Sequence, residues 1–377
     1  MPGKTRRVRP RPPIEPGCFR TLMDFMKRFE RQPLLIPFFV TVGLLATPLD
    51  AEWTILDHAH LQANYDAETD EWELGVNPGH GGTGLLAPDT TILLLDAATR
   101  MTVPELDSSW DFMGEQGDEV WATSEFGFAQ YGVPTGVFTG GDDGRIEMTL
   151  AGYDSPDEFF MYRPGDSSSP LRFDTRLESG PYGSVELDAG GHRHYSWAFR
   201  ARGIYLATIE ASGVRESDGV ETSSEPATFI FLVDPSPVDW WVLEHFGTEA
   251  NQPSAALDAD PGGEGVTNLQ KYAFGLDPKA PCRDGLPSME VRTEDEGEAY
   301  LWISYRRPEG REDVRYSVQV SADPSEWESI DESGARTEWS SDSDGTPVIS
   351  VSDVSPLAPA TSRFMRVRTE WSPYVED

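Results

Sequence analysis

Residues 190–213 read GGHRHYSWAFRARGIYLATIEASG and form the most informative stretch of the chain. Aromatic and β-branched residues are dense in it, and glycines interrupt it, as expected of two consecutive β-strands. His192 and His194 are two residues apart at the start of the first strand. Because side chains alternate between the faces of a strand, the two imidazoles are expected to point the same way. Two such imidazoles on a rigid strand make half of a metal site.

Residues 52–234 continue this pattern of short strands, separated by clusters of Gly, Pro, Asn and Asp. With no long helical pattern between the strands, the spacing predicts an antiparallel β-sandwich. The predicted strands are 54–65, 71–76, 91–95, 145–150, 158–162, 184–187, 194–199, 204–211 and 228–233. We expect the core to contain Trp72, Trp197, Phe199, Tyr205, Leu206 and Phe229.

The composition changes at residues 234–237, which read DPSP. Helical spacing of apolar residues predicts helices over 238–246 and 266–274, each followed by a glycine. Strand signals return at 299–306, 315–321, 347–352 and 364–369. The prediction is therefore an all-β protein with two antiparallel, Ig-like β-sandwich domains, 52–234 and 282–377. A short helical linker with an acidic loop, 235–281, joins them.

Residues 1–51 have the composition of a secretory signal peptide. They hold nine Lys and Arg against four acidic residues, and the apolar run LLIPFFVTVGLLA at 34–46 precedes small residues. That run is shorter than the roughly 20 residues a membrane span needs. We expect an exported protein, periplasmic, at the cell surface or extracellular, with no membrane span in the mature chain. Only Cys282 would remain after cleavage, so no intramolecular disulfide is expected.

The chain is strongly acidic, with a formal net charge of −35. Because the expected leader is basic, the mature part is more acidic still. Such a surface repels nucleic acid and anionic lipid, so neither is predicted as a partner.

Four segments of the first predicted domain form a recognisable set: TILDHAH at 54–60, GVPTGVF at 132–138, GHRHYSWAF at 191–199 and SEPATF at 224–229. In order and spacing they resemble the choice-of-anchor M domain, a bacterial surface-anchored repeat family, over residues 53–234. The resemblance implies an exported, β-rich envelope protein. Because some members are encoded beside metal-type ABC transporters, it also implies such a transporter system as a partner, besides an envelope or extracellular ligand.

The sequence departs from that family at two places. His58-Ala59-His60 stands where the family usually has His-Val-Asp, and residues 75–77 read GVN where a further His-x-His is usual. His80 in the following loop is a possible substitute for that pair. Residues 238–278 resemble a helix and acidic-loop module found in exported bacterial proteins, and residues 282–377 resemble the small β-sandwich that commonly follows it.

The chain has six histidines, and four of them form two His-x-His pairs. Neutral imidazole is the commonest metal ligand, and it suits transition metals such as Zn²⁺, Mn²⁺ or Cu²⁺. The metal hypothesis takes His58, His60, His192 and His194 as ligands, with Asp188 as a weaker candidate, and favours Zn²⁺ or Mn²⁺. The alternative is that the pairs are polar residues at strand edges, unrelated in space.

The acidic loop is a degenerate match to a calcium-binding loop. Asp260, Glu264 and Asn268 fit positions 1, 5 and 9, and Asp258 lies nearby. Position 3 is Gly262, and position 12 is Lys271 where a bidentate carboxylate is needed. The sequence therefore argues against Ca²⁺ and favours a turn that caps a helix.

No nucleophile elbow, metalloprotease helix or phosphate-binding loop is present in the sequence. The predicted function is non-catalytic: an exported binding or surface-interaction protein. One alternative is an envelope metal-binding accessory protein that uses the two His-x-His pairs. Another is a carbohydrate-binding or adhesive module, with Trp110, Trp121 or Tyr131 as exposed stacking surfaces.

Overall fold

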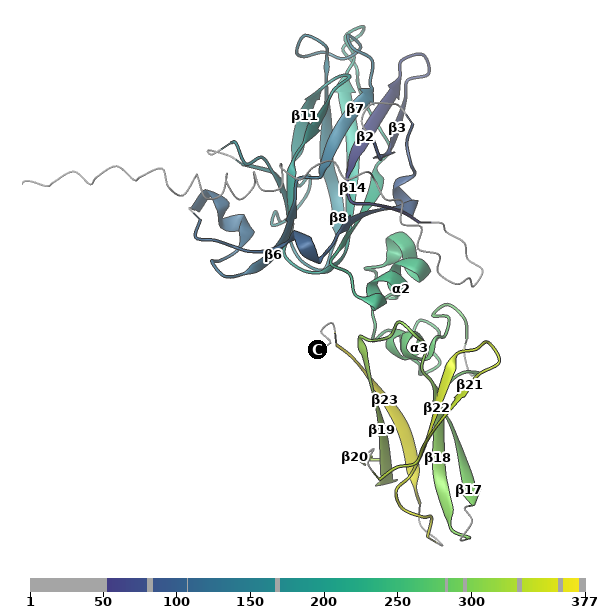
Figure 1. The fold of residues 1–377 in the computed structure, drawn as a ribbon. Helices are drawn as coiled ribbons and strands as arrows, with labels where there is room; N and C mark the ends of the chain where they lie inside the picture. The colour runs from purple at the N-terminus through teal and green to yellow at the C-terminus, as the bar shows by residue number, and fades with distance from the viewer. Residues whose placement is uncertain are drawn as a thin grey trace, which may run out of the picture.

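The structure is a computed structural model that describes residues 53–79, 84–106, 108–166, 170–281, 284–293, 297–330, 334–358 and 362–372. The predicted leader, His80 and Cys282 lie outside the described residues. Strands dominate the described part, which confirms the all-β class. Two β-rich parts lie at opposite ends of the molecule, with two helices between them (Figure 1). None of the described helices is long and apolar enough to cross a membrane.

Three sheets build the N-terminal part (Figure 1). The largest has the order β1-β4-β16-β14-β8-β11, with β15 on β14. Its strands are β1 (Thr54–Leu56), β4 (Thr91–Leu95), β16 (Ala227–Val233), β14 (Gly203–Val214), β8 (Arg145–Asp154), β11 (Ser184–Asp188) and β15 (Glu221–Ser223).

The other two sheets are smaller and run β10-β9-β13-β6-β5 and β12-β7-β2-β3. The first consists of β10 (Leu171–Asp174), β9 (Phe159–Tyr162), β13 (Ser196–Phe199), β6 (Glu119–Thr123) and β5 (Arg100–Thr102). The second consists of β12 (His192–His194), β7 (Phe126–Gly132), β2 (Ala59–Asp66) and β3 (Glu71–Asn77).

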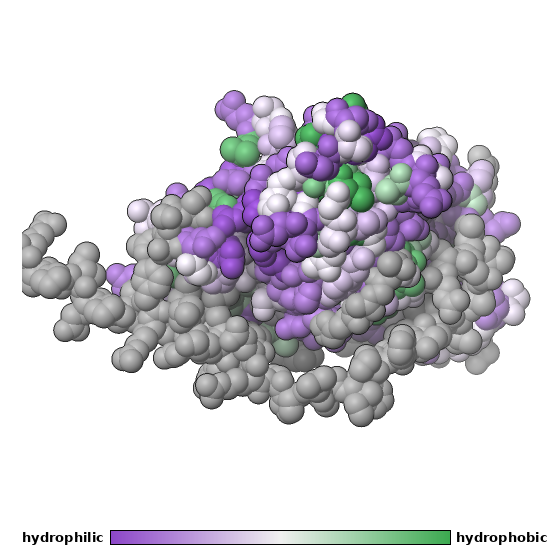
Figure 2. All heavy atoms as spheres, turned by 90° about the horizontal axis from the view of Figure 1, so that it is seen from above, coloured by the Kyte–Doolittle hydropathy of each residue, from purple (hydrophilic) through white to green (hydrophobic). Residues whose placement is uncertain are grey.

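One apolar cluster draws side chains from all three sheets, which places the main core between them. Five of the six predicted core residues are buried, and Trp72 is partly buried at the edge of the cluster. Side chains on the end of the molecule seen from above are mostly hydrophilic, with scattered apolar ones (Figure 2). This distribution agrees with an apolar interior and an acidic, well-solvated surface.

The prediction of antiparallel pairing is wrong at three places. β1 pairs with β4, β4 with β16, and β2 with β7, all in parallel. Alternation of apolar residues reports which face of a strand is buried, and this is the same for either direction of the neighbour. The direction is set by long connections that a local pattern does not reveal.

Two predicted strands are each broken into two. Residues 54–65 form β1 and β2 with a break at Asp57 and His58. The predicted strand 194–199 begins at the end of β12 and continues in β13, and the chain changes sheets at Tyr195. The histidine pairs therefore lie at or next to strand ends.

The predicted helices are confirmed as α2 (Pro237–Phe246) and α3 (Asn268–Phe274). Ser236 and Asp239 form a capping box at the start of α2, and Gly275 ends α3 in the left-handed conformation. The helices pack on the outer face of β16 and β14, and an apolar cluster there includes Trp241 and Tyr272. The segment between the β-rich parts is thus a packed layer.

The C-terminal part has two sheets, β17-β18-β22-β21 and β20-β19-β23, around a separate apolar cluster. Asp313 connects this part to the helices, since its carboxylate accepts hydrogen bonds from the Val238 amide (3.1 Å) and the Tyr272 hydroxyl (2.7 Å). The strands are β17 (Ser288–Thr293), β18 (Ala299–Arg306), β19 (Val314–Asp323), β20 (Glu326–Ser329), β21 (Thr337–Ser341), β22 (Pro347–Ser352) and β23 (Phe364–Trp371).

Candidate metal centre

The two histidine pairs meet on the sheet β12-β7-β2-β3. His60 on β2 lies opposite Gly127 on β7, and Gly127 lies opposite His194 on β12. Gly127 therefore has an imidazole on the strand to either side of it, and it places no side chain between the two rings. One step along, Ala129 lies between Gln62 and His192. These small residues on the middle strand leave the space in which imidazoles of non-adjacent strands approach one another.

Three histidines form a compact group of possible ligands. The ligand nitrogens of His58, His60 and His194 all lie within 4.8 Å of one another. The Nε2 atoms of His60 and His194 are 3.1 Å apart. Two nitrogens bound to one tetrahedral Zn²⁺ at 2.0–2.1 Å are about 3.3 Å apart, so this pair already has the spacing of metal ligands. The three residues could hold a metal ion.

Two of these rings are fixed by acceptors behind them. His58 Nδ1 lies 2.9 Å from a carboxylate oxygen of Glu125, and His194 Nδ1 lies 3.0 Å from the carbonyl oxygen of Ser124. An acceptor at Nδ1 keeps the proton there in the neutral ring and leaves Nε2 as the ligand atom. Carboxylates and carbonyls commonly orient metal-binding histidines in this way.

The electrostatics of the site favour a neutral His194 ring and an ionised Glu125 carboxylate. Burial lowers the pKa of His194 below its usual value. The hydrogen bond from His58 lowers the pKa of Glu125, so this carboxyl stays charged. Since neutral imidazole is the form that coordinates metals, both shifts suit a metal site.

His192 is close to the group but does not converge with it. Its ring centroid is 5.1 Å from that of His60 and 5.9 Å from that of His194. Tyr131 lies on its other side, with ring centroids 5.5 Å apart. His192 is exposed, whereas His60 is fully buried. It therefore stands at the solvent-facing rim of the cluster.

Asp188 does not belong to the cluster. Its carboxylate accepts a 2.8 Å hydrogen bond from Arg145 on the neighbouring strand. Its carbonyl helps to hold the turn that leads to His192, together with buried Gln130. The Gln130 amide, oriented to satisfy both groups, donates to the carbonyl oxygens of Asp188 and Gly191, each at 3.1 Å.

The candidate calcium residues are engaged by the protein itself. Asp260 accepts backbone hydrogen bonds from Glu264 and Gly265, and Glu264 pairs with the Lys271 ammonium at 2.6 Å. Asn268 donates to two loop carbonyls, and Asp258 is exposed. Among the described residues, no acidic group here converges as the three histidines do. The buried ammonium of Lys271 supplies a positive charge inside the loop.

The aromatic residues of the carbohydrate hypothesis are not exposed as that hypothesis requires. Trp110 and Trp121 are only 4% and 5% exposed. Both pack in the interior, so neither offers a stacking surface, and this part of the prediction is wrong. Tyr131 is partly exposed but faces His192.

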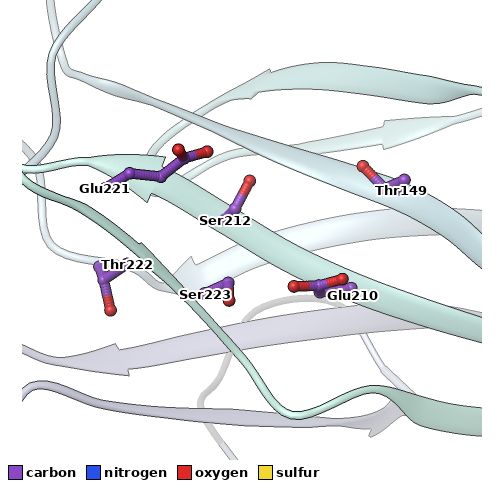
Figure 3. A pocket seen from close by; sticks show the side chains of 6 residues that line it. All are labelled: Thr149, Glu210, Ser212, Glu221, Thr222 and Ser223. Carbon is purple, nitrogen blue, oxygen red and sulfur yellow. The ribbon is translucent and has the colours of Figure 1, made fainter. Parts of the chain in front are cut away.

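A polar hollow of about 390 Å³ lies elsewhere, on strands β8, β14 and β15 (Figure 3). Only carboxylate and hydroxyl side chains line it, those of Thr149, Glu210, Ser212, Glu221, Thr222 and Ser223. It lacks an aromatic platform and lies on a different sheet from the histidines.

Sequence reasoning missed three parts of the histidine site: Glu125, the Ser124 carbonyl and Gly127. A signal for the last existed, because residues 126–129 read FGFA, with large residues for the core alternating with small ones for the other face. No protein-family model matches the chain, and a search of curated proteins finds no match; the likeness to the choice-of-anchor M domain stays a prediction.

Proposed function

We propose that this protein binds a transition-metal ion through His58, His60 and His194. One observation carries the proposal: the ligand nitrogens of three imidazoles, brought together from sequence-distant segments, converge within 4.8 Å. Glu125 and the Ser124 carbonyl support it, because they aim the Nε2 atoms of His58 and His194 at the common space.

Zinc suits this donor set better than manganese does. All three ligands are imidazole nitrogens, which favour Zn²⁺ and Cu²⁺, whereas Mn²⁺ prefers oxygen ligands. The carboxylate beside the rings, that of Glu125, is hydrogen-bonded to His58. Of the two metals expected from the sequence, we therefore propose Zn²⁺ over Mn²⁺.

We propose His192 as the fourth ligand. It shares a strand and a face with His194, and Ala129 opposite leaves room for its ring to turn. Two ligands fixed by acceptors, the buried His60 and one ligand at the rim make a site that the metal enters and leaves past His192. Zn²⁺ bound by four imidazoles would have four tetrahedral protein ligands and no open coordination position, as in sites that bind the metal without catalysis.

The setting of this site is part of the proposal. The leader-like composition of residues 1–51 supports export, and the family resemblance supports a role beside a metal-type ABC transporter in the envelope. The separate apolar clusters support two β-rich domains, 52–234 and 282–377.

The test is a zinc titration of the purified, metal-free protein against a chromophoric chelator. We expect one tightly bound ion per chain, and loss of binding in His60→Ala. His245→Ala is the matched control, because His245 lies on α2, next to Trp241 and outside the histidine group. Failure of the wild-type protein to compete for zinc would overturn the proposal, as would an equal loss in the control.

A further inference from the structure

Strand β17 is an edge of the C-terminal part that carries exposed apolar side chains. It is the outermost strand of the order β17-β18-β22-β21 (Figure 1). Met289 and Val291 on it are 54% and 57% exposed. An exposed edge strand presents backbone donors and acceptors, and apolar residues on it make it a site for pairing with another strand.

Met289 and Val291 face the core side of their sheet. They lie opposite Ile303 and Leu301 on β18, which are both buried in the C-terminal core. The opposing sheet, β20-β19-β23, has three strands against four and leaves these two side chains exposed. The apolar face of this sheet thus extends to its edge, where no other part of the described chain covers it.

The charges of β17 are arranged so that the strand complements itself. Glu290 and Arg292 flank Val291, point to the other face of the sheet and pair with each other at 2.6 Å. If two copies of β17 pair antiparallel about Val291, Glu290 of each copy lies opposite Arg292 of the other. Opposite charges directly across a strand pair stabilise it, and like charges destabilise it.

We propose that the protein forms a symmetric dimer through antiparallel pairing of β17 with β17 of a second copy. A twofold axis at Val291 joins the two four-stranded sheets into one, and each contact off the axis occurs twice. Met289 and Val291 of both copies then cover one another on the core side. Two Glu290–Arg292 pairs form on the opposite side.

A second copy suits this edge better than an unrelated partner does. The chain has a net charge of −35, so two copies repel unless the contact itself supplies positive charge. Arg292 supplies it. Its guanidinium pairs with Glu290 of its own strand at 2.6 Å and with Glu338 at 2.7 Å, lies 4.3 Å from the centre of the Trp302 ring, and in the dimer also faces Glu290 of the second copy. The other edge strand, β21, reads TEWSS and has no basic residue.

The test is a charge exchange across the axis, read by sedimentation equilibrium of the full protein. Glu290→Arg alone places two arginines opposite each other in both pairs, and Arg292→Glu alone places two glutamates opposite each other. We expect each single variant to weaken dimerisation by at least about tenfold, since like charges oppose at two places. The double variant restores opposite charges in both pairs and should dimerise again.

Glu370→Arg on β23 is the control, because its side chain is 45% exposed, the substitution changes the net charge as much as Glu290→Arg does, and β17 stays intact. Far-ultraviolet circular dichroism identical to that of the wild type would show that each variant is folded. A wild-type protein that stays monomeric at every concentration overturns the proposal. A folded double variant that stays monomeric beside a dimeric wild type overturns the pairing about Val291.

Discussion

His60 and His194 lie on strands that are not neighbours, yet their Nε2 atoms are 3.1 Å apart. Strand β7 lies between β2 and β12, and side chains two strands apart in a flat sheet are separated by about 9–10 Å at the backbone. The rings span that distance by leaning toward each other over Gly127, which has no side chain to keep them apart. The candidate site therefore depends on a residue that binds nothing.

Replacing Gly127 with alanine should damage the site. A Cβ atom there would lie 2.6 Å from the Arg193 carbonyl oxygen and 3.1 Å from the His194 Cα atom, so β12 would have to shift. We expect zinc affinity to fall at least tenfold and stability to fall by about 1–3 kcal/mol, as for other overpacking substitutions. Zinc competition and chemical denaturation measure the two effects.

Gly152→Ala on β8 is the matched control, because the nearest atom to its new Cβ would be Thr208 Cβ at 3.7 Å, an ordinary contact. It should change neither quantity much. Unchanged zinc binding in Gly127→Ala would show that the histidines do not need the space above this residue.

Glu125→Ala removes the acceptor behind His58 and should loosen the metal without abolishing binding. Loss of such a supporting partner typically costs about 10–100-fold in metal affinity. The mechanism is the lost 2.9 Å hydrogen bond to Nδ1, after which the ring can turn and its tautomer is no longer fixed. Glu119→Ala, an exposed residue on β6 that pairs with Arg100, is the control for the change in charge. Equal affinities in the two variants would contradict the supporting role.

The sequence is enough to predict the local features of this site, but not the way in which its strands pair. The spacing of the His-x-His pairs is enough to predict that each pair faces one way, and residues 204–211 and 228–233 are predicted core strands that the structure confirms. Pairing is a tertiary property, however. Nothing local shows that β2 and β12 flank the same strand, that β2 runs parallel to β7, or that Glu125 in a turn ends beside His58.

The breaks in the strands cannot be predicted from the local sequence either. Residues 194–199 are predicted as one strand because their composition is uniform, but Tyr195 is buried in the core where the chain passes from one sheet to another. A change of sheet requires partners on both sides, and these come from β7 and from β6 and β9, far away in sequence. Strand propensity cannot report it.

His192 should decide whether the bound metal has an open coordination position. With Co²⁺ in place of zinc, four imidazoles give a tetrahedral ion that absorbs strongly in visible light and has no position for an added anion. We expect the wild-type cobalt spectrum to be insensitive to azide. His192→Ala should still bind cobalt through the other three histidines, but its spectrum should change when azide is added.

Tyr131→Phe is a suitable control, because it alters the neighbour of His192 and leaves all four imidazoles in place. An azide-sensitive wild-type spectrum would mean that His192 does not complete the site, although metal binding by the three histidines would stand. Absence of any cobalt or zinc binding would instead refute the metal proposal as a whole.

The ammonium of Lys271 occupies the acidic loop where a bound metal ion would otherwise supply the positive charge. Its side chain is fully buried, bonds Glu264 at 2.6 Å and donates to the Pro278 carbonyl oxygen at 3.1 Å. Lys271→Met removes the charge and leaves the Glu264 carboxylate facing a methyl group. Breaking a buried pair from one side costs about 3–5 kcal/mol, and the partial exposure of Glu264 argues for about 3 kcal/mol here. Chemical denaturation measures the loss, with Lys279→Met, an exposed lysine in the segment that follows α3, as the control.

Calcium should not stabilise the wild-type protein, because the ammonium already neutralises Glu264 and would repel the ion at close range. Stabilisation of the wild type by millimolar calcium would show instead that Lys271 can leave and that the loop accepts a metal.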